Sequence, residues 1–172
     1  MLQNDGDEEL LRCIQLRTAG AADEAFLLNL FATTRETELG ALNLDDRQKK
    51  LFIAMQFNAQ KTQYATIYPK ADSKVILSNN DPVGRLIVDR AEREFTLVDI
   101  SLLPTHRGKG VGGQLIKNLL RDAAAQEKAV RLSVWQTNPA KKLYERLGFA
   151  TVDDAGVYCE MCWTPSAKSF DP

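Results

Sequence analysis

The stretch Arg107-Gly108-Lys109-Gly110-Val111-Gly112-Gly113 decides the fold of this chain. Four of the ten glycines lie within its last six positions, between a strand-like run at 95–103 and a segment with helical spacing. Glycines allow backbone N–H groups to approach a ligand that a Cβ would keep away. The N-terminus of the following helix adds unpaired donors and partial positive charge, which favour an anion. The stretch therefore predicts a phosphate-binding loop.

The size and charge of the chain are those of an ordinary globular protein. Its 172 residues fit one domain, which we place at 10–166 with short tails at 1–9 and 167–172. The 22 basic and 23 acidic side chains give a net charge of −1, which offers no field to hold nucleic acid. No apolar run reaches the roughly 18–20 residues of a membrane span, and the acidic N-terminus does not resemble a signal peptide. We therefore expect a cytoplasmic protein that binds neither nucleic acid nor a membrane, and a homodimer stays open as its assembly.

The part of the chain before the loop predicts a strand, two helices and then hairpins. The strand is at 12–17, and the helices run over 21–34 and from position 45 or 46 to about 64, with a polar link at 35–43 between them. Alternating apolar runs separated by turn residues then predict antiparallel strands at 73–77, 83–89 and 95–103.

The part after the loop predicts a parallel crossover. A helix from 111 to about 128 leads to a strand at 130–135, and such a β-helix-β unit makes the two strands parallel neighbours. A short helix at 141–147 and two strands around a turn at 152–156 follow. Cys159 and Cys162 form a C-x-x-C pair on the last strand, where positions i and i+3 face opposite sides, so we interpret both as structural.

Two other kinds of glycine loop fit less well. A nucleoside-triphosphate loop needs a Lys-Ser or Lys-Thr pair after its last glycine, which is missing here. The letters of a dinucleotide-binding G-x-G-x-x-G are present at 108–113. However, the acidic residue expected at the end of the next strand is replaced by Trp135-Gln136-Thr137, and too little chain remains for a second half.

A third interpretation uses both the loop and a later motif. Arg107-x-x-Gly110-x-Gly112 resembles the Q/R-x-x-G-x-G/A signature of the GCN5-related N-acetyltransferases (GNAT). The stretch from Asn138 to Phe149 is similar to the second hallmark of that family, N-x-x-A-x-x-x-Y-x-x-x-G-F. The resemblance is specific over about 83–163 and rests on element order alone before that. It implies a GNAT fold, with a mixed, mostly antiparallel sheet of about six to seven strands and about four helices.

The resemblance implies that acetyl-CoA is the co-substrate. Backbone amides of the loop would hold its diphosphate, and the pantetheine arm would lie along the end of the preceding strand and near the second hallmark. The positions that this implies for the cofactor are Leu102, Leu103, Arg107, Gly108, Lys109, Gly110, Val111, Gly112, Gly113 and Asn138. The sequence leaves open whether Arg107 acts through its backbone or its side chain. Asn138 could equally be a helix cap.

The implied reaction is direct attack of a primary amine on the thioester, in a ternary complex. Tyr144 occupies the family position of the general acid that protonates the CoA thiolate, and a phenol with an ordinary pKa of about 10 is protonated at neutral pH. A backbone N–H near Leu103 would bind the oxyanion. Our candidate base is Asp99, with deprotonation through water, or an ion pair of Asp99 with Arg85 or Arg90, as the alternatives.

The acceptor is the least defined part. Glu36, Phe52 and Gln56, from the polar link and the second helix, are the candidate contacts for a small-molecule or amino-acid-like amine, with ordinary packing as the alternative. No metal or redox cofactor is required. A non-catalytic acyl-CoA-binding sensor and a dinucleotide-binding protein are the competing functions.

Overall fold

The computed structural model describes residues 11–165, so the tails expected at 1–9 and 167–172 lie outside the described residues. The described chain divides into two compact units, of which the first holds residues 11–87 and 99–112 and the second holds 88–98 and 113–165. The extent of a single domain at 10–166 stays a prediction. Within residues 11–165, no helix is both long and apolar enough to cross a membrane.

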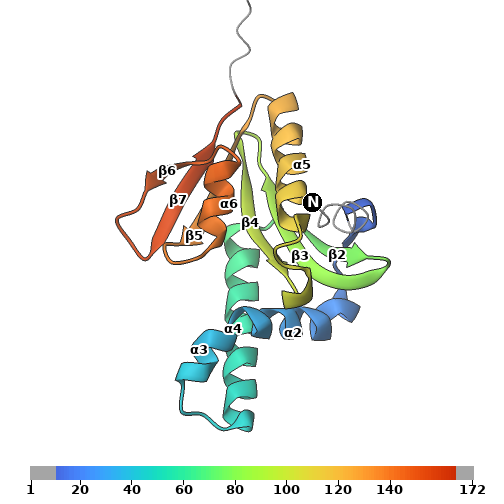
Figure 1. Cartoon of the computed structure of the whole chain (residues 1–172), viewed down its shortest axis with the longest axis vertical. Coiled ribbons are helices and arrows are strands. Elements are labelled where there is room, and N and C mark those ends of the chain that lie inside the picture. Colours follow the sequence, from blue (N-terminus) through green and yellow to red (C-terminus); the bar gives the residue numbers. More distant parts are fainter. Residues whose placement is uncertain (1–10, 166–172) are drawn as a thin grey trace, which may run out of the picture. The chain divides into compact units, whose positions relative to one another are not determined.

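The helices and strands follow the order expected from the sequence (Figure 1). Their bounds are β1 (Ile14–Thr18), η1 (Ala21–Asp23), α2 (Glu24–Thr34), α3 (Glu36–Ala41), α4 (Asp46–Ile67), β2 (Asp72–Ser78), β3 (Asp81–Arg90), β4 (Glu94–Leu102), η2 (Pro104–His106), α5 (Val111–Ala125), β5 (Ala129–Trp135), α6 (Ala140–Arg146), β6 (Ala150–Asp153) and β7 (Tyr158–Trp163).

The seven strands are hydrogen-bonded in the order β1-β2-β3-β4-β5-β7-β6. The pairs β1–β2, β5–β7 and β6–β7 are antiparallel, whereas β4 and β5 are parallel, as a strand-helix-strand crossover requires. Asn79 and Asn80 have φ values of 50° and 69°, the left-handed conformation of a tight hairpin turn between β2 and β3. The expected mixed, mostly antiparallel sheet is confirmed.

Two local expectations were wrong. The segment 35–43 was expected to be a polar link, but it contains the short helix α3, which an Arg35–Glu38 ion pair at 2.9 Å supports. Leu39 of α3 packs against the apolar cluster that Phe31 of α2 forms with Ile53 and Phe57 of α4, and this packing explains the helix. The expected turn at 152–156 begins later, because Val152 and Asp153 belong to β6.

Each of the two units has a core of buried apolar side chains. In the first unit, Phe31 of α2 packs with Ile53 and Phe57 of α4, and the ring centroids of Phe31 and Phe57 are 5.7 Å apart. Asp45 caps α4 by accepting a hydrogen bond from the Gln48 amide at 2.8 Å. In the second unit, Cys159 on β7 is fully buried and Cys162 is partly exposed, and both are free thiols.

Asp23 provides a pH-dependent contribution to the stability of the first unit. Arg17 donates to both of its carboxylate oxygens at 2.7 and 3.0 Å, and the Gly20 amide donates to it at 2.8 Å. The hydrogen bonds from Arg17, and next the one from Gly20, lower the pKa of Asp23 to about 2. Because this pKa lies below that of the unfolded chain, the stabilisation is complete above the unfolded pKa and is lost as the pH falls towards about 2.

We therefore expect Asp23→Asn to lower the denaturant midpoint by a constant amount above about pH 5, and the difference from wild type to shrink between about pH 4 and 2. Asp46→Asn, at an exposed position on α4, is the control. A difference between wild type and Asp23→Asn that does not change with pH would contradict this account.

Candidate active site

The glycine loop has the backbone geometry of an anion site. The 3₁₀ turn η2 follows β4, and its hydrogen bond from the Arg107 amide to the Pro104 carbonyl, at 3.3 Å, uses the first amide of the loop. Gly108 and Gly110 then have φ values of 74° and 82°, a conformation that L side chains rarely adopt. A Cβ at Gly108 would meet no atom within 4 Å, so the loop is open at this point.

The amides from Gly108 to Gly112 are the potential donors. In the part of the chain that the structure describes, none of them donates to a backbone or side-chain acceptor, because the first intrahelical bonds of α5 begin further along. Val111, the first residue of α5, is 1% exposed, so its side chain packs in the core at the start of the helix. Unpaired N–H groups at a helix N-terminus bind phosphate oxygens well.

Two side chains of the loop differ in their contacts. Lys109 is exposed and forms no ion pair within residues 11–165. Arg107 uses its side chain within the protein: Nε donates to the Leu102 carbonyl at 2.7 Å, and Nη2 donates to Thr33 Oγ1 at 3.0 Å. Both groups that the sequence left open as phosphate contacts of Arg107 bind within the protein here, because its amide donates to Pro104 and its guanidinium to Leu102 and Thr33.

The end of β4 separates from β5 in the hydrogen-bond register. The two strands pair only over Glu94–Leu97 and Ala129–Leu132, although β4 continues to Leu102.

The Leu103 amide donates to the Val83 carbonyl at 2.8 Å, and the Leu103 carbonyl accepts from His106. The expectation of an oxyanion donor near Leu103 is therefore wrong for the Leu103 amide itself, because this N–H already donates to a carbonyl of β3.

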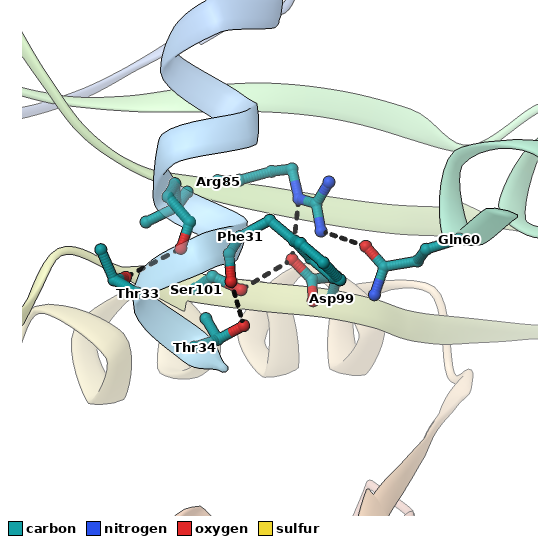
Figure 2. A network of polar contacts seen from close by, with 8 residues as sticks. Phe31, Thr33, Thr34, Gln60, Arg85, Asp99 and Ser101 are labelled. Atoms are coloured by element: carbon teal, nitrogen blue, oxygen red, sulfur yellow. Dashed lines mark hydrogen bonds and ion pairs between the residues drawn. The ribbon is translucent and has the colours of Figure 1, made fainter. Parts of the chain in front are cut away.

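Asp99 belongs to a polar network that connects β3, β4 and α4 (Figure 2). Its Oδ2 accepts from Arg85 Nε at 2.9 Å and from Ser101 Oγ at 3.0 Å, and Arg85 Nη2 donates to Gln60 Oε1 at 2.9 Å. The side chains of Arg85 and Asp99 are 9% and 16% exposed, so this charged pair lies inside a strongly apolar strand segment. This ion pair of Asp99 with Arg85 is one of the alternatives to a catalytic base that the sequence left open.

The three candidate acceptor contacts lie in the first unit, on α3 and α4. Glu36 is exposed in the first turn of α3, and Phe52 is partly buried on α4. Gln56 Oε1 is buried and has no hydrogen-bond partner in the described part of the chain. A buried polar atom without a partner is uncommon, so Gln56 offers a recognition group for a donor on a ligand.

The second unit contains the second motif. Asn138 Oδ1 accepts from the Ala140 amide, the first amide of α6, at 2.9 Å. Asn138 is exposed, and its Nδ2 has no partner within residues 11–165. Tyr144 is 7% exposed and packs edge-to-face on Phe149, with ring centroids 5.8 Å apart. Gly113 lies on α5, where an added Cβ would meet Leu143 of α6 at 3.6 Å.

Thr33 is a contact of the loop that sequence reasoning missed. It is 74 positions before Arg107, and a threonine near a helix end has no pattern that indicates such a contact.

Among the described residues, no group of three or more histidine, cysteine, aspartate or glutamate side chains is arranged to hold a metal ion.

Comparisons with known proteins agree with this geometry. Residues 69–151 match the family model described as an acetyltransferase (GNAT) domain. Over 81 residues the chain is 37% identical to the [ribosomal protein bS18]-alanine N-acetyltransferase of Haemophilus influenzae. That alignment covers 45% of this chain and 54% of the relative, so the chain spans about half the length of the curated relative that it matches.

Two solved structures have the same fold over most of their length. The PaiA N-acetyltransferase of Thermoplasma acidophilum, in complex with coenzyme A, aligns with a TM-score of 0.67 and 16% identity over 88% of this chain and 98% of that one. The spermidine N-acetyltransferase of Vibrio cholerae, in complex with CoA and spermine, aligns with a TM-score of 0.61 and 19% identity over 90% and 97%. At these identities the likeness establishes the fold.

Proposed function

We propose that the chain, whose residues 69–151 match the model of an acetyltransferase (GNAT) domain, transfers the acetyl group of acetyl-CoA to a primary amine. The observation that carries the proposal is the row of amides from Gly108 to Gly112 that donate to no acceptor within residues 11–165, a row that includes the left-handed residue Gly110. CoA is the ligand of two fold neighbours, the enzymes from Thermoplasma acidophilum and Vibrio cholerae.

The cofactor would be held by main-chain donors. The diphosphate accepts hydrogen bonds from the amides of Gly108 to Gly113, and Lys109 adds a cation at the rim. The pantetheine arm lies along Leu102 and Leu103, where β4 has passed the end of its register with β5. The Leu103 amide is not available to it, because this N–H already donates to the Val83 carbonyl. Asn138 contributes its free amide nitrogen, Nδ2, while its oxygen accepts from the first amide of α6.

The transfer itself is one displacement. The neutral amine attacks the thioester carbonyl carbon, the C–S bond breaks, and the departing thiolate takes the phenol proton of Tyr144. The proton that leaves the attacking nitrogen passes to Asp99 or to water. Within the described chain, Asp99 Oδ1 has no protein partner, because Arg85 and Ser101 both bind Oδ2, so this oxygen is available to the amine or to a bridging water.

The acceptor would be a small-molecule or amino-acid-like amine that contacts α3 and α4. The unpartnered oxygen of Gln56 supports an acceptor with an N–H donor, Glu36 adds an exposed negative charge, and Phe52 adds apolar surface. One fold neighbour has spermine bound, and the name of the curated relative gives an alanine of a ribosomal protein as its acceptor. An acceptor screen should therefore include both polyamines and peptides with a free amino terminus.

The experiment that tests the function measures CoA release from acetyl-CoA with a panel of primary amines, including spermidine, single amino acids and peptides with a free amino-terminal alanine. We expect release that depends on one acceptor class, and a loss of amine-dependent rate in Asp99→Asn with the affinity for CoA unchanged. Tight CoA binding without turnover on any acceptor would instead make the protein an acyl-CoA sensor. Thermal protection by NAD, and not by acetyl-CoA, would overturn the assignment.

A further inference from the structure

Arg107 connects the glycine loop to a distant helix of the same unit. Its guanidinium donates to the carbonyl of Leu102, the last residue of β4, at 2.7 Å. It also donates to Thr33 on the last turn of α2, to Oγ1 at 3.0 Å and to the carbonyl oxygen at 3.4 Å. One side chain therefore ties together the loop, the end of β4 and the end of α2.

The contact with α2 fits the chemistry of a helix C-terminus. The last carbonyls of a helix have no intrahelical partner and carry partial negative charge, which a cation stabilises. The last turn of α2 has no basic residue of its own, and Arg35, which follows it, directs its guanidinium to the Phe31 ring and to Glu38. Arg107 supplies the cation from another part of the chain.

Thr33 is suited to this contact. Its Oγ1 donates to the Leu30 carbonyl at 2.8 Å and accepts from Arg107, so both hydrogen-bonding capacities of the hydroxyl are used. The next residue, Thr34, donates in the same way to the Phe31 carbonyl at 2.7 Å, and Arg107 does not contact it (Figure 2 shows both threonine bonds). The two neighbouring threonines therefore differ in the contact with the loop.

We propose that Arg107 is a positioning residue that couples occupancy of the glycine loop to the position of the C-terminal end of α2. The inference rests on the proposed binding of CoA at this loop. Arg107 directly precedes Gly108, so a ligand that orders the loop also orders the guanidinium. The guanidinium in turn holds Thr33 in position. Thr33 lies three residues before Glu36, the first of the proposed acceptor contacts, so the position of Glu36 follows that of Thr33. Cofactor binding then orders one side of the acceptor site before the amine arrives.

The test is a double-mutant cycle on CoA affinity, measured by calorimetry without any acceptor. Thr33→Val keeps the shape of the side chain but removes the acceptor of the Arg107 hydrogen bond, and we expect it to weaken CoA binding about fivefold. Thr34→Val, which loses an equivalent bond to the helix backbone, is the matched control and should change the affinity less than about twofold. In an Arg107→Gln background, Thr33→Val should have no further effect.

Three outcomes separate the possibilities. Equal affinities for Thr33→Val and Thr34→Val, or effects of Thr33→Val and Arg107→Gln that simply add, overturn the coupling. A wild-type protein that binds no CoA overturns the proposed function instead. As a second measurement, hydrogen exchange at residues 30–35 should slow on addition of CoA in the wild type and not in Arg107→Gln, and slowing in both variants would also contradict the proposal.

Discussion

Replacing Tyr144 with phenylalanine is expected to lower kcat by about two to four orders of magnitude, the range of general acid–base catalysis, while the affinity for CoA stays within about twofold. The variant removes one hydroxyl and keeps the ring that packs edge-to-face on Phe149. Without the phenol, the CoA thiolate has to leave unprotonated, and the barrier of the chemical step rises. Steady-state CoA release and calorimetric CoA binding measure the two quantities separately.

The control for this variant removes a phenol hydroxyl elsewhere in the same unit. Tyr158 is 50% exposed and packs against Trp135, so Tyr158→Phe should keep wild-type kcat. If Tyr144→Phe retains kcat within about twofold, Tyr144 is a core aromatic residue only, and water or another group protonates the thiolate.

Replacing Gly110 with aspartate is expected to raise the Kd for CoA by roughly 100-fold or more, about 2.7 kcal/mol. Gly110 has a φ of 82°, and an aspartate directly before Val111 would place a carboxylate at the N-terminus of α5. The carboxylate would accept hydrogen bonds from the same amides that are proposed to bind the diphosphate, and it would repel the phosphate charge.

Gly110→Asn is the matched control, because asparagine has the same shape without the charge and tolerates a left-handed conformation. Its Kd should rise by less than about tenfold, so the difference between the two variants measures the charge repulsion. Wild-type affinity in Gly110→Asp would show that CoA binds elsewhere on the molecule.

Local patterns in the sequence predicted most of the fold. The strand, helix and turn signals for β2 to β5 and α5 are strong because each element has a clear period, and because Asn79-Asn80 marks the turn between β2 and β3 and Gly110 precedes α5. The short helix α3 was missed because six residues with a glycine at position 40 give no periodic signal. Its stability comes from packing of Leu39 on the cluster of Phe31, Ile53 and Phe57, a contact between elements that a local pattern does not contain.

The site was predicted unevenly for the same reason. Local features such as the left-handed glycines and the bond of Asn138 to the first amide of α6 follow from residues that are adjacent in the chain. The sequence left open whether Asp99 pairs with Arg85 or with Arg90, because it places positions on neighbouring strands only approximately. The contact of Arg107 with Thr33 spans 74 positions and depends on how helix and sheet pack together.

The most direct test of the central claim observes the loop amides themselves. In a ¹⁵N-labelled sample, addition of CoA should shift the amide resonances of Gly108, Gly110 and Gly112, because these N–H groups would change from water to phosphate as their acceptor. Pantetheine, which lacks the diphosphate, should leave them in place. Resonances of these three glycines that stay unchanged while saturating CoA shifts other parts of the spectrum would contradict the account.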